Sequence, residues 1–325
     1  MDRDDAGHIP IMVEEILELL APREGEVYVD LTLGRGGHAA AIGERLGRSG
    51  RVVGFDLDQA NLEFSGRRLQ PLAAEVALEH ANFAAAPDWL RRNNLAADLV
   101  LADLGFASTQ VDDPSRGLSF SQDGPLDMRL DPTATLTAET LVNESNADDL
   151  ADLIRRYGEE PLARKIAARI VAERAERPIR TTARLARVAI SAYGRRAHSS
   201  RMHPATRLFQ ALRIAVNDEL GALESIWTEL TRAIERAARP GADGNGEWAR
   251  GSWIHPGARI AFISFHSLED RIVKRAMADL ARRGFVERLT RKPVTPGEKE
   301  LARNPRSRSA KLRAIRVTRS APPEA

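Results

Sequence analysis

Short apolar or alternating runs, bounded by turn residues, recur along the chain and predict β-strands. Seven such runs cover residues 27–32, 51–58, 76–83, 98–104, 259–265, 285–290 and 313–318. Segments of helical length separate the first four runs, including 39–46 and 59–71. Strands that alternate with helices form crossover units, so we predict an α/β fold with a mostly parallel sheet.

The alternation stops after Gly105 and resumes only near Arg259. The residues between are rich in Ala, Arg and Leu, and apolar positions recur there with the 3.6-residue period of a helix. The periodic segments are 148–155, 161–175, 184–192 and a long amphipathic stretch, 205–238. We therefore predict a helical domain inserted after the fourth strand. Residues 1–110 and 213–325 then form the core, and 111–212 form the insert.

One segment interrupts this pattern without any periodicity of its own. Residues 239–257 contain five glycines and two prolines, which favour turns and irregular backbone. We expect this segment to be an exposed loop.

The composition limits the classes of protein that the chain can belong to. Its 325 residues are 43% apolar, which is typical of a globular protein of about two domains. The absence of cysteine excludes disulfides, zinc fingers, iron-sulfur clusters and a thiolate nucleophile. Residues 1–10 are polar and acidic, and no apolar run approaches the roughly 18 residues that cross a bilayer. We expect a cytoplasmic protein without a membrane partner.

The net charge of +2 hides a strong segregation of charge along the chain. Residues 1–150 carry 12 basic and 27 acidic side chains, whereas 151–213 carry 15 and 5. Residues 214–287 are balanced at 10 and 11, and 288–325 carry 11 basic and 3 acidic side chains. Two basic blocks beside an acidic half indicate a polyanionic partner for those blocks.

A nucleoside-bearing cofactor is indicated at the carboxyl ends of the first strands. The first strand runs into Asp30 and then a glycine-rich turn, 34–37, that lets the backbone approach a ligand. Asp56 ends the second strand, where a carboxylate accepts hydrogen bonds from ribose hydroxyls. Because Gly34, Gly36 and Ala39 also fit a loosened dinucleotide fingerprint, NAD remains an alternative. Asp30 and the fourth-strand Asp103 favour S-adenosylmethionine, since a cationic group would be stabilised there and a pyrophosphate repelled.

Several strings in this order resemble the RsmH (MraW) family, the bacterial 16S rRNA cytosine-N4 methyltransferases. They cover about 300 residues and lie at 32–38, 103–105 with Gln110, 123–129, 157–160, 203–213, 263–271 and 304–309. The resemblance implies a Rossmann-like class I methyltransferase core with a seven-stranded sheet and an inserted all-helical domain. It also implies 16S rRNA within the small ribosomal subunit as the partner. The cofactor site that it implies consists of Gly36, Gly37, His38, Asp56, Phe83, Asp103 and Gln110.

The chemistry that this reading requires can be assigned to residues of the sequence. Asp103 is the candidate for orienting the cofactor or the cytosine amino group, or for binding the methionyl end of the cofactor only. RNA contacts are expected from His203, Arg207, Arg213, Arg306 and Arg308. His266 with Glu269 or Asp270 is too incomplete a set to predict a metal site. A NAD-dependent oxidoreductase and a non-catalytic ribosome assembly factor remain alternatives, and a homodimer is left open.

Overall fold

The computed structural model describes residues 10–105, 108–199, 202–238 and 252–318. The chain divides into two units. The sheet unit combines residues 8–105 and 220–325, and the helical unit spans residues 106–219. The sequence places the boundaries of the insert at 111 and 212, a few residues inside those of the helical unit.

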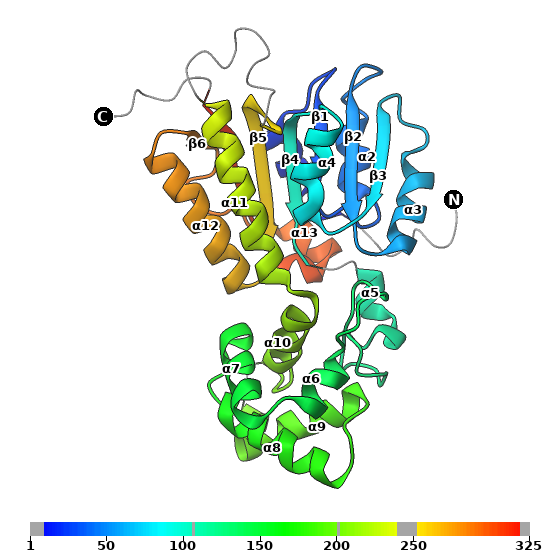
Figure 1. Ribbon diagram of the computed structural model, residues 1–325, viewed down its shortest axis with the longest axis vertical. Helices are drawn as coiled ribbons and strands as arrows, with labels where there is room; N and C mark the ends of the chain where they lie inside the picture. Colours follow the sequence, from blue (N-terminus) through cyan, green and yellow to red (C-terminus); the bar gives the residue numbers. More distant parts are fainter. Residues whose placement is uncertain (1–9, 106–107, 200–201, 239–251, 319–325) are drawn as a thin grey trace. The chain divides into compact units, whose positions relative to one another are not determined.

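The sheet unit contains a single seven-stranded sheet, in the order β3-β2-β1-β4-β5-β7-β6 (Figure 1). Its strands are β1 (Val27–Asp30), β2 (Arg51–Asp56), β3 (Glu75–His80), β4 (Ala97–Asp103), β5 (Ile254–Ser264), β6 (Val286–Arg288) and β7 (Lys311–Val317). The first five are parallel, and β7 is antiparallel to both of its neighbours. The predicted seven-stranded, mostly parallel sheet is confirmed.

Helices cover both faces of this sheet because successive strand residues point to opposite sides. One face packs on α4 (Ala86–Arg92), α11 (Glu219–Ala237) and α12 (Ser267–Arg282), and the other on α1 (Val13–Leu20), α2 (Gly37–Gly43) and α3 (Gln59–Leu69). In β1, for example, Val29 faces the first layer and Tyr28 the second. Short apolar strands buried on both sides are typical of parallel sheets.

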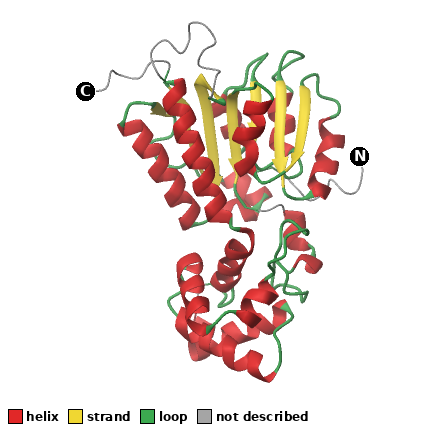
Figure 2. Cartoon of the chain, in the orientation of Figure 1, coloured by secondary structure: helices red, strands yellow, loops and turns green. Residues whose placement is uncertain are grey.

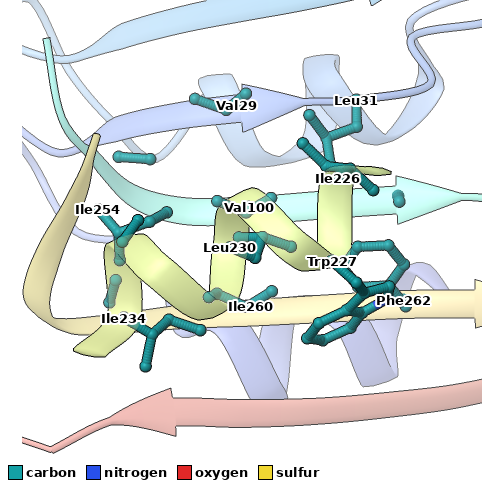
Figure 3. Packing of buried hydrophobic residues seen from close by; sticks show 14 of the residues in the cluster. Val29, Leu31, Val100, Ile226, Trp227, Leu230, Ile234, Ile254, Ile260 and Phe262 are labelled. Atoms are coloured by element: carbon teal, nitrogen blue, oxygen red, sulfur yellow. The ribbon is translucent and has the colours of Figure 1, made fainter. Parts of the chain in front are cut away.

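The first of these cores is built around α11 (Figure 3). Ile226, Leu230 and Ile234 lie one helical turn apart and pack against the strands, as their spacing in the sequence predicts. The ring of Trp227 lies 4.8 Å from that of Phe262 on β5, at an interplanar angle of 34°. Residues of α11 and β5 pack in the same core as residues of β1, β2 and β4, so the two parts of the sheet unit, before and after the helical unit in sequence, share one core.

Two sequence predictions are wrong in this unit. The third strand ends at His80, and Phe83 lies beyond it in the short 3₁₀ helix η2 (Phe83–Ala85), where Asn82 caps the backbone of Ala84. Residues 252–257 are not an exposed loop, since β5 begins at Ile254 and Trp253 is completely buried. The glycine and proline content of 239–257 concealed this strand start; residues 239–251 lie outside the described residues.

The helical unit contains no strand among residues 108–199 and 202–219 (Figure 2). Its helices are α5 (Ser108–Asp112), α6 (Ala138–Glu144), α7 (Ala147–Gly158), α8 (Ala163–Glu176), α9 (Thr182–Tyr193) and α10 (Thr206–Asn217). The apolar faces of α6 to α10 share one buried cluster, which includes Ile154, Ile166, Leu185 and Leu212. The unit therefore has a hydrophobic core of its own.

The predicted amphipathic stretch at 205–238 is two helices rather than one. Asp218 adopts a left-handed conformation with φ 47°, which ends α10 before α11 begins. Arg213 spans this break with two hydrogen bonds of 2.7 Å to the Glu219 carboxylate. The apolar periodicity continues across the break, so the pattern alone could not reveal it.

Among the described residues, no helix has the length and apolar character that spanning a membrane requires.

Candidate cofactor site

The glycine-rich turn after β1 depends on glycine at two positions. Gly36 has φ +70°, and a Cβ there would lie 3.1 Å from Ser65 Oγ. A Cβ on Gly37 would lie 2.8 Å from the side chain of Pro10. Ser65 also donates a 2.8 Å hydrogen bond to the Gly34 carbonyl. The turn is therefore held close to α3, and larger residues at these two positions would displace it.

Asp56 holds the same turn from the end of β2. Its Oδ2 accepts a 2.7 Å hydrogen bond from the Gly34 amide, and its Oδ1 accepts one of 2.8 Å from the Asp58 amide. Burial raises the pKa of Asp56 to about 6, although these bonds favour the ionised form. The side-chain amide of Asn61 also donates to both oxygens, at the longer distances of 3.3 and 3.4 Å. A ribose hydroxyl could compete with this weaker contact, so Asp56 remains a candidate acceptor for a ligand.

Asp30, at the end of β1, is almost completely buried. Its Oδ2 accepts a 2.7 Å hydrogen bond from the Tyr28 hydroxyl, and its Oδ1 accepts one of 3.1 Å from the Thr32 amide. Burial raises the pKa of Asp30 to about 6, against the effect of both bonds. Asp30 therefore fixes the first residues of the turn and places a carboxylate at the sheet edge.

Asp103 ends β4, the strand that pairs with β1. Its amide donates a 2.6 Å hydrogen bond to Thr32 Oγ1, which ties β4 to the turn. Its Oδ1 is buried and has no hydrogen-bond partner among the described residues. Burial, followed by the charges of Asp30 and Glu269, raises the pKa of Asp103 to about 8. Among the residues that the structure describes, neither Lys nor Arg forms an ion pair with this carboxylate, and His38 is its one basic neighbour.

His38 lies beside Asp103, on the first turn of α2. Its Nε2 is 2.8 Å from the Ile11 carbonyl, which can only accept, so Nε2 carries the hydrogen. This arrangement turns Nδ1 toward Asp103, at 3.9 Å from Oδ2. The side chain is buried to 8% exposure, so the ring orientation is fixed by packing as well as by the hydrogen bond.

Glu269 is a neighbour of Asp103 whose part in the site was missed in the sequence. It forms a capping box at the start of α12, where its Oε2 accepts a 2.8 Å hydrogen bond from the Phe265 amide. His266 is the N-cap residue of this box. The signal was available, since a polar residue followed three positions later by Glu is the capping-box pattern. Asp270 is engaged elsewhere, in a 2.7 Å ion pair with Arg313 on β7.

The two remaining cofactor candidates, Phe83 and Gln110, lie in the short helices that follow β3 and β4. Phe83 is half-buried and packs on the core at the start of η2. Gln110 belongs to the helical unit, where it is buried on α5. The structure therefore brings together Gly36, Gly37, His38, Asp56 and Asp103 within the sheet unit, and the assignment of Phe83 and Gln110 to the cofactor stays a prediction.

The candidate RNA residues lie in different surroundings. In the helical unit, His203 is exposed, Arg207 donates a 2.9 Å hydrogen bond to the Glu159 carbonyl, and Arg213 is paired with Glu219. In the sheet unit, Arg306 and Arg308 are exposed in η6 (Pro305–Ser309). Arg213 uses Nε and one terminal nitrogen of its guanidinium to bind both oxygens of the Glu219 carboxylate.

The edge of the sheet fits a cationic nucleoside cofactor. The buried Oδ1 of Asp103 would gain the partner that it lacks, and Asp56 presents lone pairs at the end of the next strand but one. A pyrophosphate would instead meet the carboxylates of Asp30 and Asp103. Together with the strand order, in which an antiparallel β7 is inserted between β5 and β6, these residues define a class I methyltransferase.

The family follows from comparison with known proteins. The model of the MraW methylase family matches residues 5–240 and 249–318, so the chain belongs to that family. It is an enzyme that transfers a methyl group from S-adenosylmethionine. Family membership therefore excludes the two alternative functions, a NAD-dependent oxidoreductase and a non-catalytic ribosome assembly factor.

Curated relatives match over nearly their whole length. The chain is 44% identical to "Ribosomal RNA small subunit methyltransferase H" of Symbiobacterium thermophilum over 324 residues, covering 95% of this chain and 96% of the relative. It is 43% identical to the protein of the same name from Acidobacterium capsulatum, covering 94% and 97%. The same name is given to a relative in Synechococcus elongatus that is 45% identical, covering 94% and 93%.

Proposed function

We propose that the chain methylates the exocyclic N4 of a cytidine in 16S rRNA of the small ribosomal subunit. The observation that carries this proposal is the buried Oδ1 of Asp103, which has no hydrogen-bond partner among the described residues, in a chain whose relatives are named for ribosomal RNA methylation. We propose a cytoplasmic location, because small ribosomal subunits are assembled in the bacterial cytoplasm.

Asp103 is proposed to orient the amino group and to receive its proton. When bound, S-adenosylmethionine supplies a methyl group on a sulfonium. The C–S bond breaks as the N–C bond forms, which leaves a neutral thioether and one surplus proton on N4. A carboxylate that accepts a hydrogen bond from the amino group directs the nitrogen lone pair toward the methyl group. The cationic cofactor favours the ionised carboxyl before transfer. Once the thioether is neutral, the surroundings that raise the pKa of Asp103 to about 8 in the cofactor-free protein let the carboxyl keep the proton.

The residues around Asp103 are proposed to hold the cofactor. Gly36 and Gly37 let the backbone approach it, and Asp56 accepts hydrogen bonds from the ribose. His38 supports Asp103 from the side of Oδ2, at 3.9 Å. Phe83 packs on the adenine, and Gln110 contributes a polar contact from the helical unit. Positioning of this kind supplies much of the rate of an in-line displacement.

The composition supports nitrogen rather than carbon as the methyl acceptor. Methylation of cytosine C5 by the usual route needs a cysteine to form a covalent adduct with the base, and the chain has no cysteine. An exocyclic amino group needs no adduct. The target base must be unstacked to be reached, so we infer that the cytidine lies in a single-stranded or loop region.

The basic residues of both units are proposed to bind the RNA. His203 and Arg207 lie in the helical unit, which we propose to be the substrate-recognition domain, and Arg306 and Arg308 lie near β7. The geometry favours a structural task for Arg213, because its guanidinium already makes two bonds with Glu219.

Labelled methyl transfer tests the proposal. The protein is incubated with radiolabelled S-adenosylmethionine and small subunits from cells that lack it, and the modified nucleotide is identified by mass spectrometry. We expect label in 16S rRNA as N4-methylcytidine. Methylation at C5 or on a ribose would overturn the N4 assignment, and the absence of label from intact subunits, immature subunits and free rRNA would overturn the substrate.

A further inference from the structure

An aromatic stack lies on the surface of the helical unit. The ring of His203 stacks on that of Phe120, with centroids 4.5 Å apart and an interplanar angle of 18°. Phe120 is half-buried and meets the buried ring of Phe209 edge-on, at 5.1 Å and 73°. His203 itself is exposed. The stack is therefore anchored in the core at one end, and its outer ring is accessible at the other.

The outer ring is held in one orientation. His203 Nδ1 accepts a 3.2 Å hydrogen bond from the Ala205 amide, next to the start of α10. The stack on Phe120 and this bond together restrict both side-chain torsions of His203. A surface ring that is already ordered loses little conformational entropy when it binds a ligand.

The segment that carries His203 is basic, although Arg184 in it pairs with Glu173 and Arg213 pairs with Glu219. Residues 177–217 contain nine arginines and neither Asp nor Glu. The connection from α9 to α10 contributes Arg195 and Arg196, which are both exposed in η4 (Gly194–Ser199). Arg187 is exposed on α9. This is the charge distribution of a surface that binds a polyanion.

Exposed apolar side chains occur in the same segment. Within the described parts of the chain, the exposed large hydrophobic residues are Ile190, at 39%, and Met202, at 48%. Ile190 lies on α9 three residues after Arg187, and Met202 precedes His203 directly. A surface that combines arginines, an exposed ring and apolar side chains fits a ligand that has both charged and flat apolar parts, as single-stranded RNA has.

We propose that the His203 ring, backed by Phe120, is a stacking platform for one unpaired nucleobase of the RNA, with Arg195 and Arg196 binding the adjoining phosphates. This inference rests on the proposed function and names the form of RNA that the helical unit binds. Stacking tolerates any base, because every base has a flat face. The platform therefore holds a strand in place without choosing its sequence.

A comparison of two RNA strands tests the platform in the full-length protein. The probes are a fluorescein-labelled 12-mer of uridine and a 12-mer of the same charge whose residues lack bases. Wild-type protein is expected to prefer the uridine strand. His203→Asn removes the ring but keeps an oxygen that can accept the Ala205 amide hydrogen bond. We expect this variant to reduce the preference by about 5- to 10-fold, near the lower end of what one stacked base contributes.

His203→Phe is the matched variant, because it keeps a ring that can stack but loses the acceptor for Ala205. We expect it to retain the preference for the uridine strand. A residue that acts only by capping the start of α10 would give the opposite ranking, with the Asn variant normal and the Phe variant impaired. That ranking would overturn the proposal.

Salt dependence tests the phosphate contacts. Arg195→Ala combined with Arg196→Ala should lower the slope of log affinity against log salt by about 1 to 2, since each phosphate contact contributes roughly 0.7 in single strands. Arg155→Ala with Arg156→Ala, a second pair of adjacent exposed arginines in the same unit, should leave it unchanged. Equal slopes for both double variants would overturn the role of Arg195 and Arg196.

Failure of the platform and failure of the proposed function give different results. If the wild type methylates 16S rRNA and prefers the uridine strand, but His203→Asn keeps that preference, only the platform is rejected. If the two 12-mers bind equally, and no better than polyglutamate of the same charge, the surface fits an acidic protein and the platform is rejected as well. If subunits are not methylated at all, the proposed function fails.

Discussion

The carboxyl edge of the sheet and the segment 177–217 of the helical unit, which contains neither Asp nor Glu, differ in the sign and the exposure of their charges. At the sheet edge, Asp30, Asp56 and Asp103 are carboxylates in buried surroundings, and hydrogen bonds fix the first two in position. On the helical unit, arginines such as Arg195 and Arg196 are exposed to solvent. Charge interactions are strong and specific where water is excluded, and weak and additive where salt screens them. Single substitutions should therefore have large effects at the first region and small ones at the second.

The largest effect is expected from Asp103→Asn. The substitution keeps the shape of the side chain and removes the charge that would pair with the cationic cofactor. We expect the affinity for S-adenosylmethionine, measured by isothermal titration calorimetry, to fall about 100-fold, because losing one partner of a desolvated charge pair costs roughly 2 to 5 kcal/mol. RNA affinity should change much less.

Asp98→Asn is the matched control for this substitution. Asp98 lies at the opposite end of the same strand and accepts a 2.9 Å hydrogen bond from the Val27 amide, which an Asn oxygen can also accept. We expect its cofactor affinity to stay within about twofold of the wild type. Equal losses in the two variants would mean that damage to β4, rather than the missing charge at Asp103, weakens binding.

The pH dependence of the sheet edge should be the next largest effect. The pKa of Asp103 rises from its ordinary 3.8 to about 8 on folding, so the folded cofactor-free protein binds the proton more tightly than the unfolded chain. This contribution to stability is complete below about pH 4 and is lost as the pH rises through 8. Asp30 and Asp56, with pKa values of about 6, act in the same direction between pH 4 and 6.

Cofactor binding should show the reverse trend, because the cation prefers the ionised carboxyl. We expect the affinity for S-adenosylmethionine to rise at least about tenfold between pH 6 and 7.5. The neutral thioether product should show a weaker dependence, and Asp103→Asn should flatten both. Calorimetry of the two ligands across this range checks the prediction; identical pH profiles for wild type and variant would assign the dependence to another group.

Arg213→Ala should affect stability more than RNA binding. Its pair with Glu219 is mostly shielded from solvent, with side-chain exposures of 13% and 14%. Loss of the guanidinium leaves the Glu219 carboxylate without this partner, so we expect the free energy of unfolding to fall by about 1 to 3 kcal/mol, from urea titrations followed by circular dichroism. A lower salt slope of RNA binding at unchanged stability would instead make Arg213 a phosphate contact.

The smallest effect is expected from Arg306→Ala combined with Arg308→Ala. Both side chains are exposed in η6, so the change should leave stability within about 0.5 kcal/mol of the wild type. The slope of log affinity against log salt should fall by about 1 to 2. Arg282→Ala with Arg283→Ala is the control, because these adjacent arginines pair with Asp279 and Glu235 on the protein itself. An unchanged slope for the first pair would exclude contact between η6 and phosphate.

The sequence predicts the part of the fold that depends on local pattern. Period-two and period-3.6 runs locate the seven strands and the helices α2, α3 and α7 to α11, because burial on a sheet or a helix face imposes those periods. Helices such as α1, α4 and α12 were not predicted. The break between α10 and α11 at Asp218 was not predicted, since a left-handed residue interrupts a helix without altering the apolar spacing. The start of β5 was not predicted either, because Trp253 and Ile254 follow a glycine-rich segment and are buried by residues that are distant in sequence.

The candidate site likewise has a part that the sequence predicts and a part that only the folded structure shows. Gly36 and Asp103 can be found from residue type and position in the sequence, and His38 from the resemblance to the family. The contacts that determine their chemistry cannot, since Tyr28 and Glu269 influence the carboxylates only once strands and helices have packed. Phe120 gave no signal either, because its partners His203 and Phe209 lie more than eighty positions further along the chain.

The division of the sheet unit by the helical unit has a consequence for the order of folding. Leu99 on β4 pairs with Arg259 on β5, so the sheet cannot be completed until the whole intervening helical unit has been synthesised. The helical unit is continuous in sequence, and its core can form as soon as its own residues have left the ribosome. We therefore expect the platform at His203 to be assembled while β4 is still an unpaired edge, before Asp103 has acquired its neighbour Glu269.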